Sequence, residues 1–295
     1  MVKRLVGLFW KVITRLDKKR IGGQTPPSGV HCEVDIPYID DGNPMHTLDV
    51  YYKEGTSKPQ PVIFDIHGGG WVYGNKELNK YFCMQLATHG FTVVNINYRL
   101  TTEEVFPACL LDIFAALNWV LKNGKEHFAD ADKLCIAGDS AGGHLAFTTA
   151  NVIQNPALQE ELGVSFDGKV SALGLICGAL DLERYIKLRA FRGYQELVFG
   201  QDFMNNPARH IGIPYNYLTK DLPPVYLVSS DKDFARASTL DIKPRLEKLG
   251  VPHLCRYITG KTKHKLIHVF NVIHPEWEES IEVNKEMCDF FKKYV

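Results

Sequence analysis

A serine between two glycines is the first group in this chain whose type and setting suggest chemistry. Ser140 is the centre of a Gly-Asp-Ser-Ala-Gly motif at 138–142, which follows an apolar run at 134–137 and precedes a helix-compatible run at 143–153. A strand, a tight turn and a helix in this order are typical of a nucleophile elbow. Larger residues in place of the glycines would collide with the strand and the helix. The pattern predicts that Ser140 is a nucleophile.

Three consecutive glycines follow another apolar run. The motif at 67–70 reads His-Gly-Gly-Gly and comes directly after residues 62–66. Glycines at the end of a buried strand cost backbone entropy, so we expect them where the chain must come close to something. Their amides can donate to the oxygen that becomes negative during acyl transfer. The amide of Ala141, at the positive end of the helix after the serine, is a further candidate donor.

A serine nucleophile needs a base, and the base needs an acid that orients it. After a nucleophile elbow the acid comes first along the chain and the histidine second. A strand-like run at 224–230 opens into a loop that begins with Asp231, Lys232 and Asp233. From the residues alone, either aspartate is a candidate for the acid.

Four histidines follow these aspartates: His253, His264, His268 and His274. His253 begins an apolar, strand-like run, and His274 precedes a proline at the start of the last expected helix. His264 lies in the cationic stretch 261–265, which would lower its basicity. His268 remains as the candidate base.

Together these motifs resemble the hormone-sensitive-lipase-like branch of the α/β-hydrolases. The similarity is carried by His-Gly-Gly-Gly at 67–70, by Tyr-Arg-Leu at 98–100 with Phe-Pro-Ala at 106–108, and by Gly-Asp-Ser-Ala-Gly-Gly at 138–143. The three motifs occur in the order and approximate spacing of that family. The resemblance covers residues 34–295.

The resemblance implies an oxyanion hole formed by the amides of Gly69, Gly70 and Ala141. His67 begins the glycine motif but precedes the nucleophile and stands at a strand end. We therefore expect His67, with Gly68, to support the shape of the oxyanion loop rather than to act as the base.

The resemblance also bears on the acid and the base. The loop register of the family implies that Asp233 is the acid and that Asp231 is an ordinary loop carboxylate. The sequence Ile-His-Val-Phe at 267–270 is similar to the family's His-Gly-Phe loop around the catalytic His268, with Val269 in the place of glycine.

The elements that must position these residues alternate between apolar runs and amphipathic runs. This alternation predicts a mostly parallel central sheet flanked by helices. The resemblance implies a single α/β-hydrolase domain over 1–295. The two earliest strands alternate polar and apolar residues and are expected to be antiparallel edge strands. The expected strands are 31–39, 46–52, 62–66, 91–97, 134–137, 172–177, 225–229 and 254–258, and the expected helices are 78–88, 107–122, 143–153, 238–248 and 277–294.

Two segments lie outside this pattern. Residues 1–20 form a basic amphipathic helix with seven basic residues against one acidic residue. We expect it to belong to a cap segment over 1–30 that docks on its own domain, with binding to a membrane surface as the alternative. Its longest uncharged run, 5–10, is too short for a membrane span. The aromatic-rich insertion at 182–221 is expected to be a helical cap over the substrate pocket.

Composition bears on the partners, the compartment and the cofactors of the protein. The 295 residues have a net charge of zero, which does not favour a nucleic-acid partner. The seven cysteines show no metal-ligand spacing and are odd in number, which favours a reduced, cytoplasmic setting. The sequence contains no cofactor-binding motif, and we expect neither a cofactor nor a metal ion. The sequence does not indicate an oligomeric state.

The sequence thus predicts a serine carboxylic ester hydrolase that works through an acyl-enzyme. The resemblance implies small, short-acyl esters as substrates, which include acetyl esters and esters of saccharides. Two alternatives are a membrane-surface lipase anchored through 1–20 and a ligand receptor on the same fold. A receptor has no need of a base at His268, which argues against the second alternative.

Overall fold

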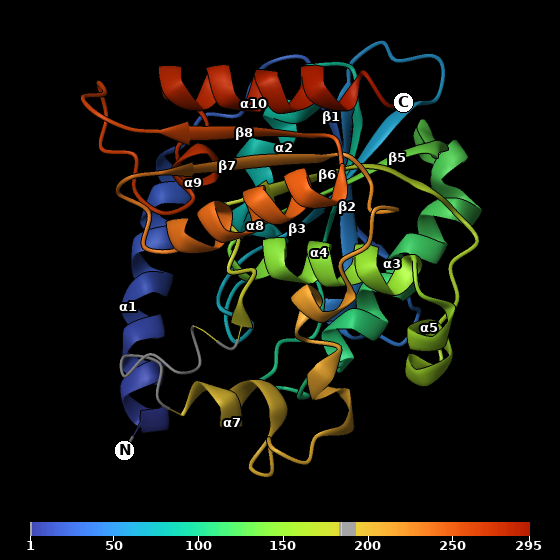
Figure 1. The fold of residues 1–295 in the computed structure, drawn as a ribbon. Coiled ribbons are helices and arrows are strands. Elements are labelled where there is room, and N and C mark those ends of the chain that lie inside the picture. Colours follow the sequence, from blue (N-terminus) through green and yellow to red (C-terminus); the bar gives the residue numbers. More distant parts are fainter. Residues whose placement is uncertain (1, 183, 185–192) are drawn as a thin grey trace.

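An eight-stranded sheet forms the centre of the structure, a computed structural model that describes residues 2–182, 184 and 193–295 (Figure 1). The strand order is β1-β2-β4-β3-β5-β6-β7-β8. The pairs β1–β2 and β2–β4 are antiparallel, and all other neighbouring pairs are parallel. The strands are β1 (Val30–Pro37), β2 (Thr47–Lys53), β3 (Gln60–Ile66), β4 (Thr92–Ile96), β5 (Ala129–Asp139), β6 (Val170–Ile176), β7 (Val225–Ser230) and β8 (His253–Ile258).

Helices cover both faces of the sheet. One face packs against α3 (Ala108–Asn123), α4 (Ala141–Ile153) and α8 (Arg236–Leu249), and α5 (Pro156–Leu162) packs against α4. The other face packs against α2 (Lys80–Ala87), α9 (Phe270–Ile273) and α10 (Glu278–Phe291). Short 3-10 helices lie in the connections: η1 (Pro44–His46), η2 (Lys76–Leu78), η3 (Gly124–His127), η5 (Pro207–His210) and η6 (Pro214–Tyr217).

The expected fold class is confirmed, and every expected strand and helix is present within a few residues of its expected bounds. The central strands are mostly apolar because both of their faces are buried, as in β4 and β6, in which every residue is buried. The two earliest strands are antiparallel as expected. Of these two strands, however, β1 alone is an edge strand, because β2 pairs with β1 on one side and with β4 on the other.

Helix α5 was not expected, although its ends carry local signals. Asn155 caps its first turn by accepting hydrogen bonds from the amides of Ala157 and Leu158, and Pro156 occupies the first helical position. Gly163 ends the helix with a φ of 65°. The helix has only seven residues, so it lacks the long apolar repeat on which helix assignment from sequence depends.

The loops after β3, β5, β7 and β8 all lie at the carboxyl ends of the strands, because parallel strands end on the same side of the sheet. The register pairs Ile66 with Gly138 at the ends of β3 and β5. It also pairs Ser230 with Ile258 at the ends of β7 and β8. The glycine motif, the serine turn, the two candidate acids and the loop that carries His268 all follow these strand ends.

Helix α1 (Val2–Gly23) lies beside the carboxyl ends of these strands (Figure 1). Arg20 donates to the carbonyl groups of Leu78 and Ile273, each at 3.3 Å, and Gln24 donates to Ile273 at 2.9 Å. Helix α1 therefore docks on its own chain. Within residues 2–182, 184 and 193–295, no helix combines the length and the apolar character that a membrane-spanning segment needs.

The division of the chain into one domain with cap segments at 1–30 and 182–221 stays a prediction. Residues 183 and 185–192, which belong to the second of these segments, lie outside the described residues. Its later part contains α7 (Tyr194–Phe199) together with η5 and η6.

A polar cluster is buried between the ends of β3 and β5. Asn79 donates to Asp65 at 2.8 Å and to Asp139 at 2.9 Å, and each carboxyl group is at most 5% exposed. Burial, followed by the charge of Asp139, raises the pKa of Asp65 to about 7. Burial also raises the pKa of Asp139, against the effect of its amide donors.

We predict that this cluster makes stability fall as the pH rises from about 5 to about 8. An aspartate in the unfolded chain has a pKa of about 3.9, so the folded protein binds more protons than the unfolded chain in this range. Asp65→Asn is neutral at every pH and keeps the acceptor oxygen. Relative to the wild type, it should gain on the order of 2 kcal/mol in unfolding free energy between pH 5 and pH 8.

Urea unfolding at the two pH values measures this difference. Asp132→Asn, which removes an exposed carboxyl group from the same strand as Asp139, serves as the control and should shift stability equally at both pH values. If Asp65→Asn also behaves in this way, the buried pair does not control the pH dependence.

Candidate active site

Ser140 occupies the sharp turn between β5 and α4. Its φ of 52° and ψ of −116° lie in a region that non-glycine residues seldom adopt. Its amide donates to Ile176 at 2.9 Å, and its carbonyl group accepts from Ala179 at 2.9 Å. These two bonds hold the turn against the end of β6.

The glycines on either side of the serine are required by packing. A Cβ atom on Gly138 would lie 2.4 Å from the carbonyl oxygen of Gly142. A Cβ atom on Gly142 would lie 1.9 Å from the carbonyl oxygen of Ile66, at the end of β3. The steric reason for these glycines that the sequence suggested therefore holds in the structure.

The structure brings Ser140, His268 and Asp233 into one hydrogen-bonded chain. His268 Nε2 lies 2.8 Å from Ser140 Oγ, and His268 Nδ1 lies 2.6 Å from Asp233 Oδ1. With the Nδ1–H tautomer, the imidazole donates to Asp233 and accepts from Ser140. This is the arrangement in which a histidine can take the proton of a serine hydroxyl.

Asp233 is fully buried, and further donors surround its carboxylate. The hydroxyl group of Ser229 donates to it at 2.6 Å and the amide of Ala235 at 2.8 Å. Burial by itself would raise the pKa of Asp233, but the hydrogen bonds and charge of His268, with those two donors, outweigh it and hold the pKa below its ordinary value. The carboxylate is therefore ionised at neutral pH and favours a proton on the facing Nδ1.

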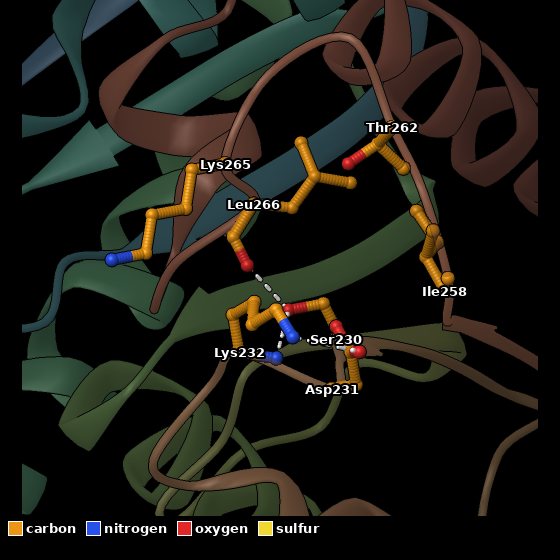
Figure 2. A pocket seen from close by; sticks show the side chains of 8 residues that line it. Ser230, Asp231, Lys232, Ile258, Thr262, Lys265 and Leu266 are labelled. Carbon is orange, nitrogen blue, oxygen red and sulfur yellow. Dashed lines mark hydrogen bonds and ion pairs between the residues drawn. The ribbon is translucent and has the colours of Figure 1, made fainter.

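Asp231 lies apart from the imidazole. Its side chain is 33% exposed and pairs with Lys232 at 3.2 Å. Figure 2 shows Asp231 and Lys232 beside Ser230, where they line a pocket of about 40 Å³, too small for an ester substrate. In the same view Ser230 donates to the carbonyl group of Leu266, which ties β7 to the loop that carries His268.

The other three candidate histidines also have partners away from Ser140. His253 Nδ1 lies 2.9 Å from the carbonyl oxygen of Val251. His264 pairs with Glu279 at 2.8 Å, and His274 pairs with Glu276 at 3.1 Å.

Val269 is the residue that departs from the resemblance, and it adopts the backbone that a glycine would allow. Its φ is 51° and its ψ is 32°, which is strained for a β-branched residue. Its carbonyl group accepts from the amides of Val272 and Ile273, both at 3.0 Å, so α9 holds this conformation in place. Val269 therefore adopts a left-handed backbone conformation of the kind that glycine adopts without strain.

The glycine motif turns sharply away from β3. Gly69 has a φ of 120° and Gly70 a φ of 60°, both in the range that favours glycine. In the described part of the chain, the amides of Gly69, Gly70 and Ala141 have no acceptor. Free amides beside a serine are what an oxyanion hole requires.

His67 and Gly68 have structural partners instead. His67 Nδ1 donates to the carbonyl group of Gly68 at 2.7 Å, and its ring stacks on Tyr98 with 4.4 Å between the ring centroids. Burial lowers the pKa of His67 to about 4, so the ring is neutral at pH 7. The amide of Gly68 donates to Asp139 at 2.9 Å.

Several residues of this region were not assigned from the sequence. Asp139 ties the glycine motif to the serine turn, and its signal was a charged residue at the end of an apolar strand. Ser229 supports Asp233, but a small polar residue near a strand end carries no particular signal. Phe234 contacts His268 in a tilted arrangement, with 4.0 Å between the ring centroids, and is 59% exposed.

One group of residues has the spacing to hold a metal ion. Ligand atoms of Cys177, Asp233 and His268 lie within 4.8 Å of one another. Asp233 and His268 are already hydrogen-bonded to each other, and burial raises the pKa of the Cys177 thiol well above its ordinary value, which disfavours the thiolate that a metal needs. The donor set fits the hydrogen-bonded chain better than a metal centre.

Comparisons with known proteins identify similar chains. Esterase LipC of Mycobacterium tuberculosis is 31% identical over 265 residues, which cover 81% of this chain and 64% of that protein. Versiconal hemiacetal acetate esterase of Dothistroma septosporum is 27% identical over 222 residues, which cover 69% and 66%. The chain thus spans about two thirds of the length of these curated relatives.

Solved structures are similar over nearly the whole chain. Esterase B of Lactobacillus rhamnosis is 31% identical with a TM-score of 0.91, and the match covers 99% of this chain and 94% of that one. An esterase of Pyrobaculum calidifontis is 25% identical with a TM-score of 0.71, over 99% and 93%. The BD-FAE family model matches residues 48–237. The chain therefore belongs to the BD-FAE family, among the hormone-sensitive-lipase-like α/β-hydrolases.

Proposed function

We propose that this protein is a serine carboxylic ester hydrolase that acts on small, short-acyl esters through an acyl-enzyme. The observation that carries the proposal is the hydrogen-bonded chain from Ser140 through His268 to Asp233. The free amides of Gly69, Gly70 and Ala141 beside it supply the second requirement of acyl transfer. The similarity to esterases of known structure supports the same conclusion.

In the proposed mechanism, Ser140 Oγ attacks the ester carbonyl carbon while His268 Nε2 takes its proton. Asp233 holds the imidazole in the required tautomer and stabilises the imidazolium ion. The amides of Gly69, Gly70 and Ala141 bind the oxyanion of the tetrahedral intermediate. His268 then protonates the leaving alcohol, and a water molecule that it activates hydrolyses the acyl-enzyme.

The substrate class is supported by two similar proteins. Esterase B was solved with a C4-C4 tributyrin phosphonate, and a Salmonella relative that is 27% identical is named an acetyl esterase. Short acyl groups such as acetyl and butyryl are thus our proposed substrates, with saccharide acetates among them. No cofactor, metal or nucleic acid is part of the proposal.

We include a cytoplasmic location in the proposal. The seven cysteines are all unpaired in the structure, which is what a reducing compartment favours. Membrane attachment through residues 1–20 is not included, because α1 uses Arg20 and Gln24 to dock on its own chain.

The first test is removal of the nucleophile. Ser140→Ala should lower kcat for p-nitrophenyl acetate and butyrate by at least about 10⁴-fold, because no other group can form the acyl-enzyme. Its urea midpoint should stay close to that of the wild type. Ser57→Ala, at an exposed position, is the control and should retain full activity. Inactivity of the wild type on all esters, or full activity of Ser140→Ala, would contradict the proposed function.

The second test decides between the two candidate acids. Asp233→Asn should lower kcat about 10⁴-fold, since an amide in place of the carboxylate favours the wrong imidazole tautomer. Asp231→Asn should change kcat less than about threefold, because the Asp231 side chain pairs with Lys232 rather than with His268. The same steady-state assay compares the two variants. A larger loss for Asp231→Asn would reverse the assignment of the acid.

A further inference from the structure

Two aromatic side chains that the mechanism does not use lie against the glycine motif at 67–70. Trp10 is on α1, and Tyr194 is the first residue of α7. A Cβ atom on Gly70 would lie 2.7 Å from the hydroxyl oxygen of Tyr194 and 3.0 Å from Cζ2 of Trp10. Both rings therefore occupy the space that a side chain at position 70 would fill.

The two rings are held in place by several contacts. Trp10 Nε1 donates to the Tyr194 hydroxyl oxygen at 3.2 Å, and the indole stacks on Tyr73 with 4.7 Å between centroids and 22° between planes. Tyr73 in turn donates to Asp17 of α1 at 3.1 Å. Trp71 contacts Tyr194 edge-on with 6.5 Å between ring centroids. The rings are thus parts of a rigid cluster that joins α1, the glycine turn and α7.

The chemistry of the tetrahedral intermediate tells which part of the substrate this cluster meets. The oxyanion lies on the amides of the glycine turn, and the leaving alkoxide must lie near His268 Nε2 to receive its proton. Phe234 contacts that imidazole, with 4.0 Å between the ring centroids and a tilt of 37° between the rings, and we place the alcohol beside it. The acyl group takes the remaining direction, which we assign to the side of Gly70 where Trp10 and Tyr194 lie.

We propose that Trp10 and Tyr194 form the end wall of the acyl pocket and limit the length of the acyl chain that the enzyme accepts. The inference rests on the proposed function and names the structural origin of its short-acyl preference. A longer chain must displace the indole from its hydrogen bond to Tyr194 and its stack on Tyr73. Pockets discriminate about 10- to 200-fold for one methylene group.

The test compares kcat/KM for p-nitrophenyl acetate, butyrate, hexanoate and octanoate. In Trp10→Ala the ratio of octanoate to acetate should rise at least about tenfold over the wild type. Trp10→Phe keeps an aromatic ring on Tyr73 and should change the ratio in the same direction by less. Leu16→Ala, at a residue of the same helix that is 58% exposed, is the matched control and should leave the ratio unchanged.

A uniform loss across all chain lengths in both Trp10 variants, with the ratio within twofold of the wild type, would show a purely structural role and overturn the inference. A second series of acetates with methyl, butyl and octyl alcohols is run in parallel. If Trp10→Ala relaxes selectivity in this series instead, the wall belongs to the alcohol and the inference is wrong. Neither result affects the proposed function, which is tested separately by the activity of the wild type and by Ser140→Ala.

Discussion

The first turn of α4 packs directly against the end of β3, and the other parts of the site depend on this contact. Gly142 leaves no room for a side chain against the carbonyl oxygen of Ile66. The contact fixes both the amide of Ala141 and the turn that presents Ser140. It also sets where the chain leaves β3, and hence where Gly69 and Gly70 begin their turn. The proposed nucleophile and the proposed oxyanion donors thus depend on one point of close packing.

Around this point the structure separates ionised from neutral polar groups. Asp233 keeps its charge because three donors surround it, whereas burial raises the pKa of the deeper Asp65 to about 7. His67 and His144 are buried with pKa values near 4, so they serve as neutral hydrogen-bonding groups. His144 accepts from Trp71 at 3.2 Å and donates to the carbonyl group of Gly212 at 2.9 Å. Of these three histidines, only His268 is hydrogen-bonded to both a carboxylate and a hydroxyl group.

The fold and the core of the site could be predicted because they depend on local patterns. Apolar runs mark the buried strands, and the glycines beside Ser140 mark a turn that no other residue fits. The choice of Asp233 over Asp231 needed the resemblance. The two residues are two positions apart, and the end of a strand cannot be predicted from sequence more accurately than that. The contact of Asp139 with Gly68 joins residues 71 positions apart, and that of Trp10 with Tyr194 joins residues 184 apart. Neither contact produces a periodic pattern in the sequence, because each depends on how two distant segments meet in space.

The docking of α1 has a consequence for the order in which the protein forms. Its partners include Leu78, Tyr194 and Ile273, so α1 cannot complete its contacts until residue 273 has been synthesised. The sheet and the loops at its edge do not need α1 for their own pairing. Closing a loop of more than 180 residues costs entropy that only the assembled core repays. Trp10 can thus reach its position in the proposed end wall only after Tyr194 has been synthesised and has packed against the glycine motif.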